Sequence, residues 1–423
     1  MPRLSMRRLS TRPLLFALAA ALPLAGCDVF GSKDDPTTDE IFEQGKTDPN
    51  AVANVGYVPV QPFFSQGSGA AFQRPMDVYV GYDQFVYVVD ARGVHVLDLA
   101  GRPQALLAEA NGQPFHDVQS VIQDRRFHVY VTARRDTTVE GRTRRLPVVY
   151  RISGLTTGSP KVEDVIWHPF DDLSRRIVLR TPQDFDEQVR FTSVAVQPDN
   201  RIYVARSGPN ITGLTVALNT VMEFTPQGVN DRNVTQLSPT RPSLLSSVNP
   251  TAVLTRVHPP QRTSFTPSLD FWVAQSPVSV TGATTAIQFG VLSVRVTETI
   301  DGYVYSADTA PLAAAQSGRA LYTTNRFALP TGLAFAADGT NYLFVTDAGK
   351  DSVFVFNSTG VEGVAPPPGA TSPLPVNVSF GGEGDGPLAL RDPQGVAYFR
   401  RTLYVADTGN NRIARYRLNT DLE

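Results

Sequence analysis

The chain has 423 residues, of which 42% are hydrophobic and 18% are charged. Its 32 glycines and 33 prolines are too many for a helical bundle and too few for a disordered chain. The formal net charge of −2 lacks the basic excess of a general nucleic-acid-binding protein, so no nucleic-acid partner is expected.

Residues 1–26 have the organisation of an export signal. Arginines at positions 3, 7, 8 and 12 precede an apolar run of 12 residues, Leu14 to Ala25. A bilayer span needs about 20 residues, so this run predicts a signal-peptide core and not a membrane anchor. It ends in Leu24-Ala25-Gly26-Cys27, which resembles the lipobox of bacterial lipoproteins. The resemblance implies that Cys27, the one cysteine of the chain, carries the lipid.

Residues 27–54 are predicted to form a flexible acidic tether. Seven acidic residues and almost no apolar periodicity occur between positions 28 and 50, a composition that cannot bury enough surface to fold. Within it, Ser32-Lys33-Asp34-Asp35 resembles a signal that sends lipoproteins to the cell surface, although an ordinary solvated linker explains it equally well. We expect attachment to a membrane of the bacterial cell envelope through the lipid, with the outer membrane favoured and surface display left open.

From residue 55 onward, short β-branched and aromatic runs alternate with Gly, Pro, Asn and Asp, which is typical of many short strands. One pattern recurs in three places: Arg74–Val80 with Phe85–Asp90, Leu329–Phe335 with Tyr342–Asp347, and Asp392–Tyr398 with Thr402–Tyr416. The last copy closely resembles an NHL repeat, the unit of one β-propeller family. The resemblance implies an all-β propeller whose small sheets stack side by side around a channel.

Two columns of residues predict the number of blades. An aliphatic residue is expected on each innermost strand, at Val78, Val118, Val194, Val294, Leu333 and Val396. An aromatic residue is expected on each second strand, at Tyr87, Tyr130, Tyr203, Tyr305, Phe344 and Tyr404. Six rows predict a six-bladed, monomeric propeller over residues 55–423, with seven blades as the alternative because Phe271–Ala274 lies in the longest insertion. The last blade ends at its third strand, so Val55–Val60 is expected to supply its outer strand and close the ring.

The first candidate site is the mouth of the channel. The residue before each aliphatic position is small or acidic, namely Asp77, Asp117, Ser193, Ser293, Gly332 and Gly395. Asp77, Asp117 and the adjacent His116 are therefore predicted to be polar groups at that mouth. Two carboxylates and an imidazole could hold Ca²⁺ or a polar ligand, or they could simply cap backbone N–H groups at turns.

A second polar column, Asp90, Asp308, Asp347 and Asp407, follows the aromatic residues. Its recurrence favours a scaffold role, with Asp suited to the turn between the second and third strands. The column is interrupted by Ala133 and Arg206.

The second candidate site is an arginine-rich hairpin. Eight arginines and three acidic residues lie between positions 124 and 151, and the expected insertion Asp136–Pro147 contains Arg142, Arg144 and Arg145. The planar guanidinium group suits carboxylate and phosphate partners. The hairpin is predicted either to bind an acidic partner or to be a solvated loop.

Two functions remain open. The favoured one is a non-enzymatic, cofactor-free module that binds a protein or a glycan. The alternative is a metal-dependent hydrolase or lyase, because propellers of similar fold include calcium-dependent lactonases and peptide-amidating lyases that hold a metal in the channel. Only Asp77, His116 and Asp117 approach that pattern. No catalytic residue is assigned, since the sequence has no nucleophile elbow, phosphate loop or paired histidines at metal-ligand spacing.

Overall fold

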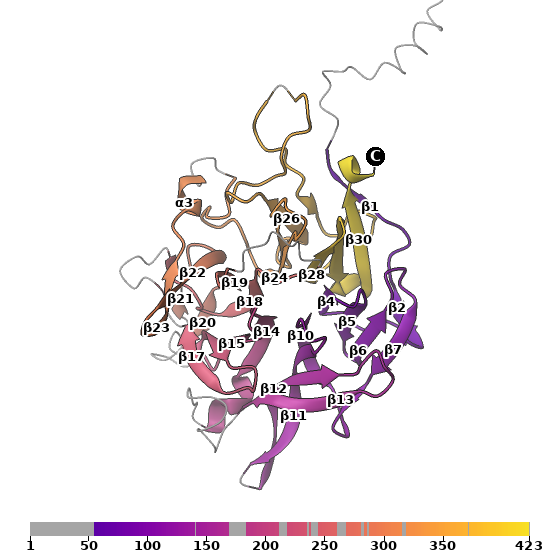
Figure 1. The fold of residues 1–423 in the computed structure, drawn as a ribbon, viewed down its shortest axis with the longest axis vertical. Coiled ribbons are helices and arrows are strands. Elements are labelled where there is room, and N and C mark those ends of the chain that lie inside the picture. Colours follow the sequence, from indigo (N-terminus) through magenta and orange to yellow (C-terminus); the bar gives the residue numbers. More distant parts are fainter. Residues whose placement is uncertain are drawn as a thin grey trace, which may run out of the picture. The chain divides into compact units, whose positions relative to one another are not determined.

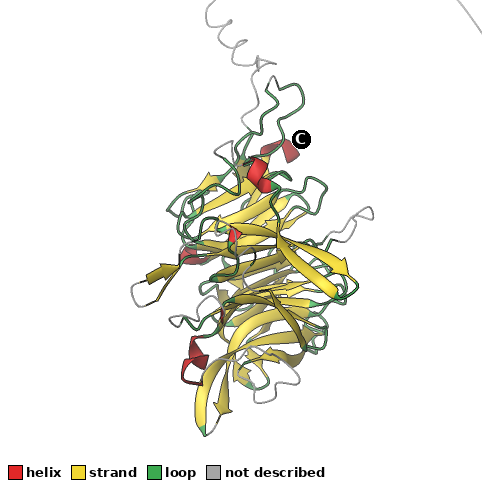
Figure 2. Ribbon diagram, turned by 90° about the vertical axis from the view of Figure 1, so that its left-hand side faces the viewer, coloured by secondary structure: helices red, strands yellow, loops and turns green. Residues whose placement is uncertain are grey.

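The computed structural model describes residues 55–139, 141–168, 183–210, 218–234, 237, 244–259, 268–280, 283–285, 287–314, 319–370 and 372–422. The expected signal peptide, Cys27 and the tether lie outside these residues. Six four-stranded antiparallel sheets surround a common axis (Figure 1). Strands make up nearly all the regular structure (Figure 2). Within the described residues, no helix is long and apolar enough to cross a membrane.

The first three blades follow the chain outward from the axis. Blade 1 comprises β4 (Asp77–Val80), β5 (Val86–Asp90), β6 (Gly93–Leu97) and β7 (Pro103–Leu107). Blade 2 comprises β10 (His116–Gln123), β11 (Val129–Val139), β12 (Arg142–Ser153) and β13 (Lys161–Trp167). Blade 3 comprises β14 (Arg190–Val196), β15 (Ile202–Ser207), β16 (Thr220–Phe224) and β17 (Asn230–Val234).

The other three blades complete the circle. Blade 4 comprises β18 (Pro250–Thr255), β19 (Phe271–Gln275), β22 (Val291–Thr299) and β23 (Gly302–Ala307). Blade 5 comprises β24 (Pro330–Phe335), β25 (Leu343–Asp347), β26 (Ser352–Phe356) and β27 (Phe380–Gly381). Blade 6 comprises β28 (Pro393–Phe399), β29 (Thr402–Asp407), β30 (Arg412–Leu418) and β1 (Tyr57–Pro59).

Short elements decorate the connections between these strands. They are the paired strands β2 (Gln66–Gly67) and β3 (Ala70–Ala71), β8 (Glu109–Ala110) and β9 (Gln113–Pro114), β20 (Val278–Val280) and β21 (Ala283–Thr285), with the helices η1 (Gln183–Gln188), α3 (Pro311–Ala314), η4 (Thr408–Asn410) and η5 (Asn419–Asp421).

The ring is closed in two ways. Each innermost strand contacts the innermost strand of the next blade, in the cyclic order β4, β10, β14, β18, β24, β28 and back to β4. The first described strand, β1, pairs with β30, with Tyr57 opposite Leu418 and Pro59 opposite Tyr416. The strand from the start of the propeller thus supplies the outer strand of its last blade and covers the edge of β30.

The prediction of six blades is confirmed, and the fourth row of the predicted columns is wrong. Phe271–Ala274 lies in β19, the second strand of blade 4, and does not form a seventh blade. Val294 lies on the third strand of that blade and Tyr305 on the outer strand, because β18 begins much earlier, at Pro250. In blade 2 the position equivalent to Val78 is Val121 and not Val118, because a bulge between His116 and Ser120 shifts the register.

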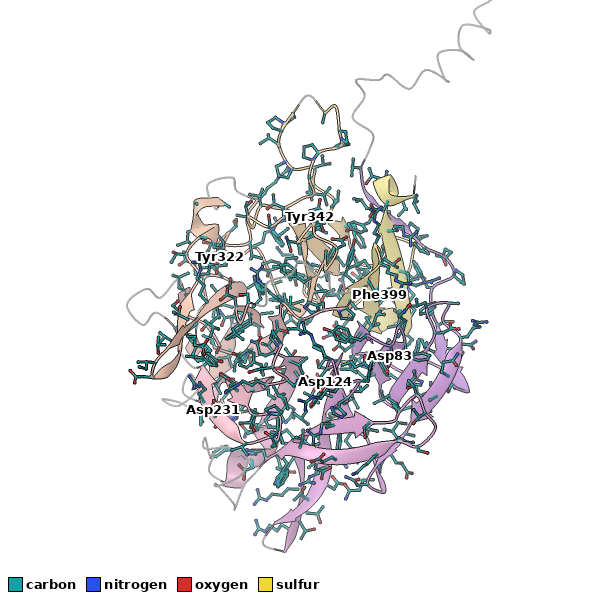
Figure 3. The ribbon with its side chains drawn as sticks, in the orientation of Figure 1. Asp83, Asp124, Asp231, Tyr322, Tyr342 and Phe399 are labelled. Carbon is teal, nitrogen blue, oxygen red and sulfur yellow. The ribbon has the colours of Figure 1, made fainter. Side chains whose placement is uncertain are left out.

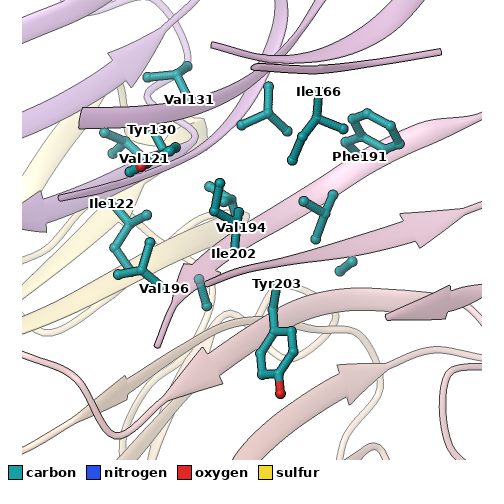
Figure 4. Close-up of a cluster of buried hydrophobic side chains, with 14 of the residues drawn as sticks. Val121, Ile122, Tyr130, Val131, Ile166, Phe191, Val194, Val196, Ile202 and Tyr203 are labelled. Carbon is teal, nitrogen blue, oxygen red and sulfur yellow. The ribbon is translucent and has the colours of Figure 1, made fainter. Parts of the chain in front are cut away.

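The core lies between the blades. The aromatic residues on the second strands are buried, with 1% of Tyr87, Tyr130 and Tyr203 exposed. Figure 3 shows the side chains over the whole ring, and Figure 4 shows the packing of Val121, Tyr130 and Val194 where blades 2 and 3 meet. At roughly 25 cal/mol per Å² of buried apolar surface, these layers between blades are the main source of stability.

Candidate functional site

The six innermost strands surround a central cavity of about 270 Å³. Each strand contributes an aliphatic residue to it at the same register position, and the structure gives the corrected column as Val78, Val121, Val194, Val253, Leu333 and Val396. The residues before them are Asp77, Ser120, Ser193, Ala252, Gly332 and Gly395, which also line the cavity. The small or acidic character predicted for this second set therefore persists in the corrected register.

Strand geometry explains why these positions face one another. In an antiparallel pair, every second residue directs its N–H away from the partner strand. Gly81 N–H bonds to Phe85 O, so the alternation directs the N–H of Tyr79, two residues earlier, toward β5 and that of Val78, three residues earlier, away from it. The Val78 N–H donates to its neighbour Asp77 Oδ1 at 2.9 Å.

Asp77, Ser120 and Ser193 each join their own blade to the next one by accepting a backbone N–H group from it. Val121 N–H donates to Asp77 Oδ2 at 2.9 Å, which links blade 2 to blade 1. Val194 N–H donates to Ser120 Oγ at 3.4 Å, and Val253 N–H donates to Ser193 Oγ at 3.2 Å. The same register position therefore supplies the acceptor at three successive junctions.

A ring of threonines lies one residue further toward the mouth. Thr192, Thr251 and Thr331 donate to the carbonyl oxygens of Pro250, Pro330 and Pro393 in the next blade, at 2.8, 2.5 and 2.8 Å. Between blades 6 and 1, Gly395 N–H donates to Met76 O at 2.9 Å. The polar groups at this end of the cavity are thus engaged in bonds between blades.

Asp77 is the titratable group at this end. Burial raises the pKa of Asp77 to about 7, against the opposing effect of the hydrogen bonds from Val121 N–H and the Ser120 hydroxyl. Its carboxyl group therefore changes charge near neutral pH while it bridges two blades.

His258 lines the same cavity beyond the end of β18, and sequence reasoning missed it. Its Nε2 lies 2.6 Å from Thr255 O, and burial lowers its pKa to about 4. The ring is neutral and donates from Nε2 to this carbonyl, so Nδ1 bears the lone pair. The segment Pro250-Thr251-Ala252-Val253, which matches Pro330-Thr331-Gly332-Leu333, was the signal that could have placed β18 and its histidine in the channel.

His116 and Asp117 lie elsewhere than predicted. Neither lines the cavity with Asp77. Both stand at the start of β10, where the side chain of Asp117 is exposed and lies 3.5 Å from Arg134 Nη1. His116 Nε2 lies 3.9 Å from Asp136 Oδ2. The expected trio is therefore divided between the cavity and the rim.

Arg145 joins His116 and Asp117 at the rim. It contacts Asp136 at 2.9 Å, and its backbone N–H donates to Glu187 Oε1 at 3.1 Å. Asp136 and Arg145 are opposite each other on β11 and β12, which continue as a two-stranded ribbon to Val139 and Arg142. Figure 1 shows this ribbon projecting from the ring. Arg142 is exposed on it and Arg144 is half-buried, so the ribbon carries all three predicted arginines.

The second polar column has a scaffold function in three blades. Asp90, Asp347 and Asp407 are buried, and each accepts a backbone N–H from the segment that leads into the innermost strand of its own blade, from Gln73, Leu329 and Arg391, respectively. Asp308 does not belong to this column, because it follows the outer strand β23. Gln275 occupies the equivalent position of blade 4 and accepts from Val248 N–H at 3.1 Å.

The residues of the channel do not fit the Ca²⁺ site considered from the sequence. Ca²⁺ takes six to eight oxygen ligands, often from several carboxylates. Asp77 supplies the carboxylate in the described lining of the cavity, and both its oxygens accept backbone N–H groups. Within the described residues, no three His, Cys, Asp or Glu side chains are grouped to hold a metal ion.

Comparison with known proteins agrees with the fold. The sequence model of the NHL repeat matches residues 390–416, which contain β28, β29 and most of β30. The chain thus forms a six-bladed β-propeller whose last blade contains an NHL repeat. No curated protein matches its sequence.

Solved structures of several proteins are similar in fold. An auxiliary nutrient binding protein from Bacteroides ovatus is 12% identical, with a TM-score of 0.50 over 86% of this chain and 77% of that one. Another such protein, from Bacteroides thetaiotaomicron, is 7% identical, with a TM-score of 0.46 over 86% and 72%. Virginiamycin B lyase from Staphylococcus aureus is 11% identical, with a TM-score of 0.39 over 86% and 99%. At these identities the likeness concerns the fold alone.

Proposed function

We propose that this protein is a non-enzymatic binding module, anchored in the bacterial cell envelope by a lipid on Cys27, whose propeller presents one face to a protein or glycan partner. The observation that carries the proposal is the use of the polar groups around the channel. Asp77, Ser120 and Ser193 accept N–H groups of the next blade, and the threonine ring donates to its carbonyl groups. Groups engaged in this way stabilise a scaffold.

The proposed binding face is the rim with the β11–β12 ribbon. Arg142, Arg144 and Arg145 are three cationic residues of this face, and Arg145 is held by Asp136. A guanidinium group held in this way can recognise a carboxylate of an acidic partner with little loss of side-chain entropy. This favours an acidic protein surface or an acidic glycan as the partner.

The lipid anchor would keep the propeller near the membrane. Val55 is 28 residues after Cys27. Even a fully extended segment of this length reaches roughly 95 Å. Replacement of Cys27 by Ser should release the protein from the membrane fraction and abolish its labelling with radioactive palmitate. Retention of both would contradict the anchor, and protease treatment of intact cells tests surface display.

The binding face is tested by neutralising the ribbon. The triple variant R142S/R144S/R145S should lose most of the partner that is cross-linked to the wild type in cells and identified by mass spectrometry. The variant R74S/R102S/R295S is the matched control, because it removes three exposed arginines from other parts of the ring. Equal recovery of the partner with both variants would exclude the ribbon.

An enzyme acting in the channel is a second candidate, and Asp77 is the observation that favours it. Its carboxyl group faces the cavity with a pKa of about 7, which suits proton transfer near neutral pH. If the wild type hydrolyses a lactone and Asp77→Asn does not, the enzyme proposal would take the place of the binding proposal.

A further inference from the structure

A second cavity, of about 250 Å³, lies between blades 5 and 6, and it shares Tyr398 with the lining of the central cavity. It opens near the turns where the innermost strands end, since Asp338 follows β24 and Arg401 follows β28. Its walls come from distant parts of the sequence, including β1, η5 and the segment Ala365–Pro368 between β26 and β27. Tyr342, on the blade 5 side of the cavity, is labelled in Figure 3.

Hydrogen bonds fix the shape of these walls. Tyr398 Oη donates to Asp338 Oδ2 at 2.7 Å, and Thr340 Oγ1 donates to Asp338 Oδ1 at 2.6 Å. Ala365 N–H donates to Tyr342 Oη at 3.1 Å, which ties the proline segment Pro366–Pro368 to blade 5. The cavity is therefore a built feature with preorganised walls, as ligand sites usually are.

Tyr57 brings a hydroxyl group to the wall of this cavity. Its side chain is 6% exposed, and its ring packs against Phe380 and Phe344 at centroid distances of 5.6 and 6.1 Å. In the described part of the chain, its hydroxyl group makes no hydrogen bond, although it shares the lining with Asp338 and Asp421. Burial, and then the negative charge of Asp421, raise the pKa of Tyr57, so the hydroxyl group stays neutral and can both donate and accept. A hydroxyl group at the wall of a cavity can bond to a ligand or to water there.

The two carboxylates of the cavity, Asp338 and Asp421, and its one guanidinium group, Arg401, already have partners in the protein, which argues against an ion as the ligand. Asp421 lies 3.2 Å from Arg401. The Asp338 carboxylate already accepts three hydrogen bonds, two from Thr340 and one from Tyr398. The pair of Arg401 and Asp421 offers donors and acceptors side by side, an arrangement that suits neighbouring hydroxyl groups of one molecule.

Much of the remaining lining is apolar, with Thr420 as a further polar residue. Tyr342 and the prolines Pro366–Pro368 present faces that suit the C–H surface of a ring. The volume of about 250 Å³ lies just below the roughly 300–1,000 Å³ of sites for drug-sized ligands, so a single ring is the appropriate size.

We propose that this second cavity binds one neutral saccharide ring, with the Tyr57 hydroxyl group at its base and the Arg401–Asp421 pair at its edge. The ring can be a free monosaccharide or the terminal residue of a glycan, because both offer the same hydroxyl groups. The proposal goes beyond the binding face described above and uses none of its residues.

The test is titration of the full chain with glucose, galactose, mannose and N-acetylglucosamine, followed by calorimetry and by saturation-transfer NMR. We expect at least one of them to bind saturably. Tyr57→Phe should weaken that binding about 3- to 10-fold, the effect of one lost hydrogen bond. Tyr416→Phe is the matched control: it removes another buried hydroxyl group without a partner, from a residue outside the described lining of the cavity. It should leave the affinity unchanged.

The outcomes separate clearly. The proposal is supported if saccharide binding weakens in Tyr57→Phe and persists in Tyr416→Phe, provided that both variants have the melting temperature of the wild type. The proposal is overturned if no neutral saccharide binds, if both variants bind like the wild type, or if only charged glucuronate or glucosamine binds. Methyl glycosides distinguish the two sources, because a site for the end of a glycan tolerates the methyl group and a site for the free sugar does not. R142S/R144S/R145S should bind saccharide normally, so failure of the ribbon proposal would be seen separately.

Discussion

Neighbouring blades of this propeller are joined around the channel in two different ways, each found along one arc of the ring. In the bridged arc, between blades 1 and 4, Asp77, Ser120 and Ser193 each accept an N–H group from the next blade. In the glycine arc, between blades 5, 6 and 1, Gly332 and Gly395 occupy the same register position. A Cβ atom on Gly332 would lie 2.4 Å from Gln394 O, and one on Gly395 would lie 2.6 Å from Asp77 Cα. The same register position thus joins neighbouring blades in two ways. In one arc a side-chain oxygen accepts a hydrogen bond, and in the other a glycine lets the two backbones approach closely.

The largest effect is expected where the two arcs meet. Gly395→Ala would place a Cβ atom 1.9 Å from Asp77 Oδ1, and the nearby backbone of Asp77 prevents a simple rotation away. We expect a loss of about 3 kcal/mol in the free energy of unfolding, the upper end for overpacking. Urea denaturation measures it. Gly386→Ala is the control, because its Cβ atom would meet nothing nearer than Ala389 Cβ at 3.9 Å. Equal stability of the two variants would show that the blades separate here at little cost.

The charge of Asp77 should make the bridged arc sensitive to pH. Its pKa is raised from 3.8 to about 7, so the folded protein binds this proton more tightly than the unfolded chain. The stability that Asp77 contributes is complete below pH 4 and is lost as the pH rises to about 7. Asp77→Asn keeps an acceptor oxygen and never ionises.

Between pH 4 and pH 8 the wild type should therefore lose stability relative to Asp77→Asn. This change with pH is independent of the constant cost in the variant of an amide NH₂ group beside one of the two backbone N–H groups that Asp77 accepts. We expect the change with pH to be about 2 kcal/mol, less than the full pKa shift would give because the side chain is only half-buried. Urea denaturation at pH 4, 6 and 8 measures it. Parallel curves for the two proteins would mean that Asp77 is ionised throughout this range.

The sequence predicted the strands of a blade correctly where a short turn and an alternating pattern of apolar residues occur together. In blades 1, 5 and 6 a short turn joins the first two strands, so the spacing from aliphatic to aromatic residue specifies both strands. Blade 4 breaks the spacing, because residues 256–270 separate β18 from β19. The prediction then took Val294 and Tyr305, two strands further out, since these residues have the same spacing.

The candidate site was harder to predict, because a side chain's role depends on which strand lies beside it. Asp77 and Asp117 have the same neighbour in sequence, a valine, and look equivalent there. Asp77 is in the register that faces the next blade, whereas the bulge in β10 leaves Asp117 at the exposed rim with Arg134. The cavity beside Tyr57 joins both ends of the propeller, so no local pattern could indicate it.

The next smaller effect on stability is expected at Ser120 and Ser193, the two serines of the bridged arc. Each hydroxyl group accepts one N–H group across a junction, at 3.4 and 3.2 Å. Replacement of Ser193 by Ala should cost about 1 kcal/mol, the net value of one such bond, and replacement of Ser120 should cost more, because its hydroxyl group also bonds to Asp77. Because the junctions are separate, the losses should add in the double variant within about 0.5 kcal/mol. Urea denaturation of the two single variants and the double variant tests both statements. A loss in the double variant well above the sum would mean that the junctions open together.

The smallest effect is expected at Ala252, which lies between the two arcs and has neither an acceptor nor the compactness of glycine. By the register, the next aliphatic residue is Leu333, which stands opposite Val345 in the pairing. Ala336 N–H bonds to Tyr342 O, so alternation directs the Leu333 N–H away from β25, toward the neighbouring blade.

Ala252→Ser would offer the Leu333 N–H the hydroxyl acceptor that Ser193 offers to Val253. We expect a gain of about 0.5 kcal/mol in urea denaturation. Ala397→Ser is the control, equally buried at 5% exposure but outside this register position, and it should destabilise. If both serines destabilise alike, a side-chain acceptor cannot extend the bridged arc to blade 5, and the difference between the arcs lies in backbone spacing.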